Sequence, residues 1–325
     1  MFNFPTMAAI AAGLMLSLSA GTSMAETLRI AHASPDQSLI HQGMLKFKAD
    51  VEAKTAGKLT VEIFPNALLG DEGPISEAVG EGSIDMGLGG VVDAIDPRLN
   101  VLALPFLFSD FDAVHRVIDG EFGQNLFKLA EPRGYKIVGV LDSGFRNFTN
   151  NVRPINTPKD FEGLKMRVPP IPVALETVKA FGALPQTVPY GETYMALQSG
   201  AVDGAEPELR DFYDAKWFEV QKYLSVANYM WMPNYWYMNG EKFNSLPADQ
   251  QAAVLDTAKD VQTWYRAQLG DVYAKIMKDV EAAGVSVNKV DTAPFVAMAE
   301  PVYEMFAKEY GADLVKSIRE AAAAK

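Results

Sequence analysis

Strands and helices alternate along the chain once its N-terminal apolar segment has ended. The segment "TLRIAHA" has the composition of a strand, and the residues that follow it have the apolar spacing of a helix, with Asp36 as the expected N-cap and Gly57 as its end. The strand "KLTVEIF", a short helix ending at Gly82 and the strand "IDMGLGG" come next. This order predicts a parallel sheet with helices on its faces, and therefore an α/β fold.

The middle of the chain repeats this order with different residues. The expected strands are "YKIVGVL", "SGFRNFTN" and "LKMRVP", and the expected helices are "IPVALETVKAFG" and "YGETYMALQSGAVDG". The aromatic segment "YMWMPNYWYMN" is strand-like, but its proline predicts a kink or an edge strand, and we expect the chain to pass between domains there. From Pro247 to about Ala283 the spacing is helical, so this helix either lies across both domains or breaks near Gly270. Two further amphipathic helices are expected at the C-terminus.

The N-terminal segment has the features of a secretory signal. Its first 25 residues carry no charged side chain, their centre is apolar, and Ser23 and Ala25 supply the small residues of a cleavage site. We therefore expect residues 1–25 to be removed after Ala25 and the protein to be exported to a bacterial periplasm without direct membrane insertion. The remainder of a 325-residue chain is long enough for two domains.

Composition excludes several classes of function. The chain has no cysteine, which rules out disulfides, thiolate metal sites and cysteine nucleophiles. The formal net charge of −12 argues against nucleic acid and anionic membrane surfaces as partners. None of the three histidines has metal-ligand spacing, and no Walker A, dinucleotide-binding or nucleophile-elbow motif is present, so we expect no metal and no cofactor.

Polar residues at strand ends and turns are the candidates for binding. In "FEGLKMRVPP", Leu164, Met166 and Val168 alternate as a buried face, which puts Lys165 and Arg167 on the opposite face. The strand-like segment "GFRNFTNN" carries a second arginine, Arg146. Two arginines can hold a carboxylate in bidentate fashion, although a surface charge or an internal ion pair is an equally open reading of each. His32 ends the first strand, where α/β proteins place ligands, but a structural histidine fits that position as well.

Carboxylates gather at the turns "LLGDEG" and "VDGAEPEL". Beside an arginine, one or two carboxylates suit a polyhydroxylated acid because they accept hydrogen bonds from hydroxyls. A glycosidase with a carboxylate pair such as Glu72 and Glu206 is the competing reading. The aromatic stripe that includes Trp231 fits either a sugar-binding surface or ordinary core packing.

Several motifs together resemble one family. "LRIAHASP", "FPNALLGDEGPISEAVGEGSIDMGLG", "VLALPFLF", "GLKMRVP", "VPYGETYMALQSGAVDGAEPE" and "WFEVQKYL" are similar, in order and spacing, to solute-binding proteins of TRAP (tripartite ATP-independent periplasmic) transporters, the DctP family, from about Thr27 to the end. The resemblance implies a two-lobed α/β fold of the type II-like periplasmic binding proteins, with a ligand cleft between lobes that close over it and a long helix spanning both. The lobes are expected to comprise residues 26–144 plus 234–272, and 145–233 plus 273–325.

The resemblance also assigns site residues. Arg167 matches the family's carboxylate-binding arginine, and Arg146 matches a second arginine directed at the same carboxylate or a nearby hydroxyl. Pro207 stands where many members have a ligand-contacting asparagine, which puts that contact in doubt, and Gly90 argues against sialic acid. The expected ligand-binding residues are Arg167, Arg146, Glu72, Glu206, Tyr190, His32, Asn150, Trp231 and Asn234.

The function expected from these observations is capture, without catalysis. A monomeric periplasmic receptor would bind a small organic acid, most of all a sugar acid such as a uronate or an aldonate, and deliver it to the small and large subunits of a TRAP permease. A C4-dicarboxylate, another carboxylate or a polyol stays open as the ligand. A periplasmic carboxylate-pair glycoside hydrolase is the alternative from another class.

Overall fold

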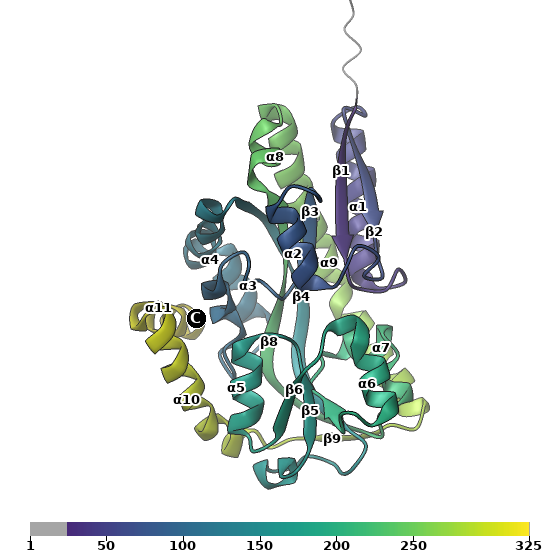
Figure 1. Ribbon diagram of the computed structural model, residues 1–325, viewed down its shortest axis with the longest axis vertical. Helices are drawn as coiled ribbons and strands as arrows, with labels where there is room; N and C mark the ends of the chain where they lie inside the picture. The colour runs from purple at the N-terminus through teal and green to yellow at the C-terminus, as the bar shows by residue number, and fades with distance from the viewer. Residues whose placement is uncertain (1–24, 325) are drawn as a thin grey trace, which may run out of the picture.

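The computed structural model describes residues 25–324 and folds them into two lobes, one above the other in Figure 1. The expected signal segment, apart from Ala25, lies outside the described residues. The strands are β1 (Glu26–His32), β2 (Leu59–Phe64), β3 (Met86–Gly89), β4 (Tyr135–Asn150), β5 (Lys165–Val168), β6 (Leu184–Thr187), β7 (Gly204–Ala205), β8 (Tyr223–Asn239) and β9 (Ser286–Lys289). They form one sheet in the order β2-β1-β3-β8-β4-β7-β5-β6, with β9 beside β8.

Helices cover both faces of this sheet. The α-helices are α1 (Leu39–Lys54), α2 (Glu72–Gly80), α3 (Phe111–Asp119), α4 (Glu121–Phe127), α5 (Pro172–Ala180), α6 (Thr193–Ser199), α7 (Leu209–Asp214), α8 (Gly240–Ser245), α9 (Ala248–Ala282), α10 (Ala293–Tyr310) and α11 (Ala312–Ala323). Short 3₁₀ helices lie at η1 (Pro97–Ala103), η2 (Lys128–Arg133), η3 (Pro158–Phe161), η4 (Tyr190–Glu192) and η5 (Trp217–Glu219). None of the described helices is both long and apolar enough to cross a membrane.

The parallel units predicted from the alternation are confirmed. In the first lobe β1 pairs in parallel with β2 and β3, and in the second lobe β5 pairs in parallel with β6 and β7. Leu28 and Ile30 pack with α1 and α9, whereas Ala31 packs with α2, so the two faces of β1 are buried under different helices. The predicted N-cap of α1 was wrong: Ser38, rather than Asp36, accepts a hydrogen bond from the backbone N–H of His41, at 3.2 Å.

Two long strands join the lobes. β4 is one continuous strand where two were predicted, and it runs antiparallel to β8 from one lobe into the other (Figure 1). Of the two alternatives predicted for Pro233, the edge strand was wrong, because β8 lies in the centre of the sheet between β3 and β4, whereas an irregularity of the strand is present. Pro233 is tolerated there because it stands opposite Asp142, where the register of the ladder shifts before Gly144 and a backbone donor is dispensable.

The helix α9 also spans both lobes. It continues unbroken through Gly270, so the first of the two alternatives left by the sequence is confirmed. Its first half buries Val254 and Val261 against α1, and its second half buries Ile276 and Val280 in the core of the second lobe. The C-terminal helices divide between the lobes: α10 packs on α5, whereas α11 packs on α3, α4 and η1. The boundaries expected for the lobes stay a proposal.

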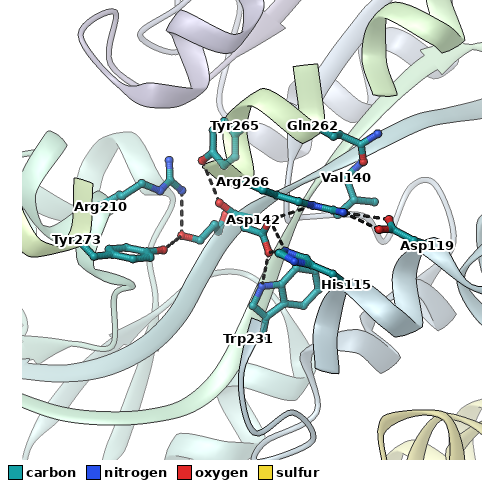
Figure 2. Close-up of polar contacts among 11 residues, drawn as sticks. His115, Asp119, Val140, Asp142, Arg210, Trp231, Gln262, Tyr265, Arg266 and Tyr273 are labelled. Carbon is teal, nitrogen blue, oxygen red and sulfur yellow. Dashed lines mark hydrogen bonds and ion pairs between the residues drawn. The ribbon is translucent and has the colours of Figure 1, made fainter. Parts of the chain in front are cut away.

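A buried polar cluster lies where β4, β8 and α9 cross between the lobes. The Asp142 carboxylate, which is fully buried, accepts hydrogen bonds from His115 Nε2 at 3.0 Å and Trp231 Nε1 at 3.2 Å, and Arg266 Nε lies 3.8 Å away. Figure 2 shows these three side chains converging on Asp142 from α3, β8 and α9. The backbone carbonyl of Asp142 accepts a further hydrogen bond from Tyr265 Oη at 2.9 Å.

Two glycines provide a matched test of this arrangement. Gly144 has φ +122°, and a Cβ there would lie 2.1 Å from Tyr273 Oη, so we expect Gly144→Ala to lower the free energy of unfolding by roughly 2 kcal/mol or more. Gly270 lies within α9 with open space around it, so Gly270→Ala should raise the free energy of unfolding by about 1 kcal/mol. Urea unfolding of the two variants measures both changes. Equal changes in the free energy of unfolding for the two variants would contradict the close packing of Gly144 against Tyr273.

Candidate ligand-binding cleft

Arg167 is a buried cation whose charge has no anionic partner among the described residues. The strand β5 ends with Arg167 and Val168, and the side chain of Arg167 is 2% exposed. Its Nε donates to the carbonyl of Val188 at 2.9 Å, and its guanidinium lies over the ring of Trp217, 5.4 Å from the ring centroid. No residue in the described part of the chain forms a hydrogen bond or ion pair with its two terminal nitrogens. Lys165, on the same nominal face, is exposed as predicted.

The electrostatics of Arg167 favour an incoming anion. Burial lowers the pKa of Arg167 to about 10, and the positive charge of Arg146 acts in the same direction. This pKa is still well above neutrality, so the guanidinium keeps its charge. Because a buried cation without a partner is costly, a carboxylate placed against the free nitrogens would be strongly stabilised.

Arg146 is held in an internal ion pair. It lies in the second-lobe half of β4, where its Nη2 donates to Glu206 Oε1 at 2.9 Å and its Nε donates to Glu206 Oε2. Tyr229 Oη donates to the same Oε2. Burial lowers the pKa of Arg146, but the charge and hydrogen bond of Glu206, together with Tyr229 and the charge of Asp211, outweigh this effect and raise the pKa above its ordinary value. The internal ion pair left open by the sequence is therefore present, and it occupies most of the guanidinium fork.

Glu72 lies at the first-lobe wall, directly after the N-cap of α2. Its Oε2 accepts hydrogen bonds from the backbone N–H groups of Gly90 at 3.0 Å and Val91 at 3.2 Å. The approach favours glycine at position 89, because a Cβ there would lie 3.0–3.1 Å from the Glu72 side chain, which is tighter than an ordinary contact. Burial raises the pKa of Glu72 to about 7, and the negative charges of Asp71 and Asp211 add to the rise.

The lobes touch each other near Glu72. Asp71 Oδ2 accepts a hydrogen bond from the backbone N–H of Gly191 in η4, at 2.8 Å. Gln37 Nε2 donates to the backbone carbonyl of Asp214 in α7, at 3.1 Å. Each contact joins a residue expected in the first lobe to one expected in the second, so the two lobes are in direct contact here.

Tyr190, Asn234 and His32 lie near the junction of the lobes with polar atoms unused. The ring of Tyr190 lies 5.6 Å from that of Trp217, and its buried hydroxyl has no hydrogen-bond partner among the described residues. The same holds for Oδ1 of Asn234, a residue that is 5% exposed. His32 is turned to His41, with 3.2 Å between Nε2 and Nδ1, and burial lowers its pKa to about 4, with the charge of His41 acting in the same direction. A neutral, buried His32 fits the structural role that the sequence left open, but its Nδ1 has no hydrogen-bond partner among the described residues, and a ligand-binding role stays an untested prediction.

Asn150 and Trp231 make internal contacts. Asn150 Oδ1 accepts hydrogen bonds from the backbone N–H groups of Val152 and Arg153, both at 2.8 Å, and so caps the turn that ends β4. Trp231 donates to Asp142 in the cluster at the crossing (Figure 2). Nothing in these contacts favours a ligand-binding role, and for both residues that role stays an untested prediction.

Two residues of the cleft were missed by the sequence reasoning. Trp217 is buried beneath Arg167, although "WFEVQKYL" had been noted as a motif. Asp211 lies in the first turn of α7, which Glu208 caps by accepting hydrogen bonds from the N–H groups of Arg210 and Asp211. The carboxylate of Asp211 acts electrostatically on Glu72, Arg146 and Arg167. The pattern "EPELRD" could have indicated a helix start. The direction in which the Asp211 side chain points, however, depends on how the whole chain folds.

Metal chemistry finds no support in this region. Among residues 25–324, no group of three or more histidine, aspartate or glutamate side chains is placed to hold a metal ion. Arg167 is available to an anion, and the neighbouring carboxylates and the amide and hydroxyl atoms of Asn234 and Tyr190 that stay unpaired within the described part of the chain are suited to hydrogen bonding. This is the chemistry of a binding site for a small polar acid.

Comparisons with known proteins agree with this geometry. A family model described as bacterial extracellular solute-binding protein, family 7, matches residues 30–309. The 2,3-diketo-L-gulonate-binding periplasmic protein of Escherichia coli is 32% identical over 97% of this chain and 98% of its own. Among solved structures, a TRAP periplasmic solute-binding protein from Roseobacter denitrificans with bound β-D-glucuronate has a TM-score of 0.88 at 32% identity, covering 90% of this chain and 99% of that chain.

A further similar structure holds a different ligand. The TRAP periplasmic solute-binding protein from Sulfurospirillum deleyianum, with bound succinate, has a TM-score of 0.85 at 31% identity, covering 92% of this chain and all of the other. The match of the family model spans most of the chain, and the relatives are matched along nearly their full length. This chain therefore belongs to family 7 of the bacterial extracellular solute-binding proteins, the DctP-type periplasmic receptors of TRAP transporters.

Proposed function

We propose that this protein captures a sugar acid, a uronate or an aldonate, in the periplasm and delivers it to a TRAP permease. The observation that carries the proposal is the Arg167 guanidinium, which is buried and charged while its terminal nitrogens meet no anion among the described residues. A single ligand carboxylate fills that place in bidentate fashion. The E. coli and Roseobacter denitrificans proteins, whose names and ligands point to sugar acids, support the same class.

The rest of the cleft suits hydroxyl groups better than a second carboxylate. Asp211 and Glu72 offer hydrogen-bond acceptors, and Tyr190 and Asn234 keep polar atoms without partners among the described residues. A C4-dicarboxylate would need a second cation, but the charge of Arg146 is already balanced by Glu206. Because a similar protein has been solved with bound succinate, a dicarboxylate is the alternative ligand class to test.

The hydrolase alternative has no support in the geometry. Both oxygens of Glu206 are engaged, one by Arg146 Nη2 and the other by Arg146 Nε and Tyr229 Oη. A carboxylate held in this way is poorly placed to shuttle a proton to a glycosidic oxygen. The relatives compared above are solute-binding proteins.

Replacing Arg167 tests the carboxylate assignment. With D-glucuronate as the probe, Arg167→Ala should weaken binding by about two to three and a half decades, because the ligand carboxylate is buried without its partner. Isothermal titration calorimetry measures the loss. The exposed neighbour Lys165 serves as the control, and Lys165→Ala should change the affinity less than threefold. A loss of affinity below fivefold in Arg167→Ala would show that Arg167 does not bind the ligand carboxylate.

Replacing Glu206 tests the ion pair behind the site. Glu206→Gln leaves Arg146 buried without its counter-charge, so we expect the free energy of unfolding to fall by roughly 3–5 kcal/mol. Chemical denaturation measures this change, with the exposed Glu219→Gln as the control for loss of a carboxylate. An unchanged free energy of unfolding would show that the Arg146–Glu206 pair contributes nothing to the fold.

A melting scan against matched acids tests the ligand class. D-Glucuronate and D-glucarate differ in the second carboxylate, and we expect only the first to raise stability strongly, by about 2.7 kcal/mol at one hundred times its Kd. Succinate and glucitol complete the set. A larger shift with glucarate or succinate than with glucuronate would replace the sugar-acid proposal with the dicarboxylate alternative. Turnover of a glucuronide would instead support a hydrolase.

A further inference from the structure

The guanidinium of Arg167 is held on two sides by groups of its own lobe. One face lies over the ring of Trp217, 5.4 Å from the ring centroid, and Nε donates to the carbonyl of Val188 at 2.9 Å. A guanidinium is weakly hydrated and stacks readily on aromatic rings, whereas its N–H groups need acceptors. The ring and the carbonyl therefore support one face and one edge, and the terminal nitrogens, which have no partner among the described residues, form the edge left for a ligand.

The strand ladder fixes the first of these supports. The strand β5 carries Arg167 between the parallel strands β6 and β7. Directly after β6, the backbone N–H of Val188 donates to the carbonyl of Val168 at 3.2 Å, which continues the pairing of the two strands. The residue that accepts the Nε hydrogen bond is therefore tied to the strand that carries Arg167.

The second support, Trp217, is fixed by the core of the second lobe. It is 1% exposed and shares a buried apolar cluster with Leu197 and Phe212, and the ring of Tyr190 lies 5.6 Å from its own. The preceding residue, Lys216, has a left-handed backbone with φ 58°, which is unfavourable for lysine. Such strain persists only where the surrounding structure imposes it, so the packing of this segment determines where the Trp217 ring lies.

We propose that Trp217 is a positioning residue that sets the preference of the site for a carboxylate. Its ring holds the plane of the Arg167 guanidinium before the ligand arrives, so little side-chain freedom is lost when a carboxylate binds in bidentate fashion. Arg167, Val188 and Trp217 all belong to the second lobe, so this arrangement needs no contact between the lobes. The inference rests on the proposed function, because it concerns the carboxylate end of the same site.

Core packing is the other role of Trp217, and the test must separate the two. Removing a buried tryptophan leaves a cavity and destabilises the fold, whatever the ring does for the ligand. A change in stability therefore decides nothing, whereas the preference between two ligands does, because a cavity alone weakens the binding of both. Trp236 is the matched control: it is fully buried in the first lobe, where its ring packs against Phe47 with 4.6 Å between the ring centroids.

The ratio of the affinities for D-glucuronate and D-glucuronamide measures this preference. The two compounds have nearly the same shape, but the amide has no charge to pair with Arg167, so the natural protein should prefer glucuronate by roughly one hundredfold. Trp217→Leu should lower this ratio by about tenfold, because the guanidinium must then be ordered on binding, and Trp217→Phe, which keeps a flat ring, by less than about threefold. Trp236→Leu should leave the ratio unchanged. Isothermal titration calorimetry measures the tight complexes, and ligand-observed NMR the weak ones.

The Arg167→Ala background shows whether Trp217 acts through Arg167. With no guanidinium to hold, adding Trp217→Leu should change the Kd for D-glucuronate by less than about threefold, whereas the same substitution in the natural protein should raise this Kd by about tenfold or more. Ligand-observed NMR again measures the weak complexes. An equal loss of affinity in both backgrounds would mean that Trp217 does not act through Arg167.

NMR of the arginine side chains tests the arrangement without a ligand. A held guanidinium rotates slowly about its Nε–Cζ bond, so Arg167 should give separate signals for its two terminal nitrogens, and the ring of Trp217 should displace its Hε signal upfield. Arg167→Lys identifies these signals by their loss. Both features should disappear in Trp217→Leu and persist in Trp236→Leu. Rapid rotation in the natural protein would contradict the proposal even if no Trp217 variant folds.

The outcomes separate this proposal from the proposed function. A lower ratio in Trp217→Leu, a small effect in the Arg167→Ala background and slow rotation of the Arg167 guanidinium support the positioning role. An unchanged ratio, an equal loss in both backgrounds or rapid rotation overturns it while leaving the receptor in place. If neither compound binds, the proposed function fails, and the NMR signals still decide whether Trp217 holds the guanidinium.

Discussion

The buried carboxylate of Asp142 holds the crossing on which the two-lobed structure depends. β4 and β8 are the described strands that run through both lobes, and their ladder is interrupted at Asp142 and Pro233. A carboxylate without charge-assisted hydrogen bonds would be too costly at a fully buried position. His115, Trp231 and Arg266 approach it from three different elements, so the network ties α3, β8 and α9 to one of the three places where the register of the two strands shifts (Figure 2).

This crossing is connected to the cleft through α7. The carbonyl of Ser143, next to Asp142, accepts hydrogen bonds from Arg210 Nη2 at 2.9 Å and from Tyr273 Oη at 3.2 Å. Arg210 also pairs with Glu208, whose carboxylate caps α7 and so fixes the turn that carries Asp211. Direct hydrogen bonds therefore connect the backbone at Ser143 with the helix whose first turn carries Asp211.

Local patterns were enough to predict much of this fold. The alternation of strands and helices gave the parallel units, and the apolar spacing after Pro247 gave a helix long enough to span both lobes, because periodicity is a property of neighbouring residues. The same reasoning placed Arg167 opposite the apolar face of its strand. It could not decide between a kink and an edge at Pro233, because whether a strand is central or at an edge depends on which distant strands pair with it.

The site was less accessible to sequence reasoning than the fold. The partner of Arg146 is 60 residues away, and no local pattern distinguishes an arginine balanced by Glu206 from one left for a ligand. Trp217 and Asp211 come from a segment whose pattern could have indicated a helix start, but not the direction in which these side chains point. What distinguishes Arg167 from Arg146 is the set of groups around each guanidinium, which only the folded chain defines.

The proposed capture of an acid is compatible with a net charge of −12, because the repulsion by the overall charge and the attraction to Arg167 act over different distances. The overall field repels an acid outside the molecule, but at periplasmic ionic strength the screening length is about 8–10 Å, so the repulsion is weak until the ligand is near the cleft. Inside, the low polarisability of the surroundings strengthens the attraction of Arg167, and the charge of Arg146 is already balanced by Glu206. The acidic surface therefore costs little affinity, while the local charge count favours an acid with one carboxylate.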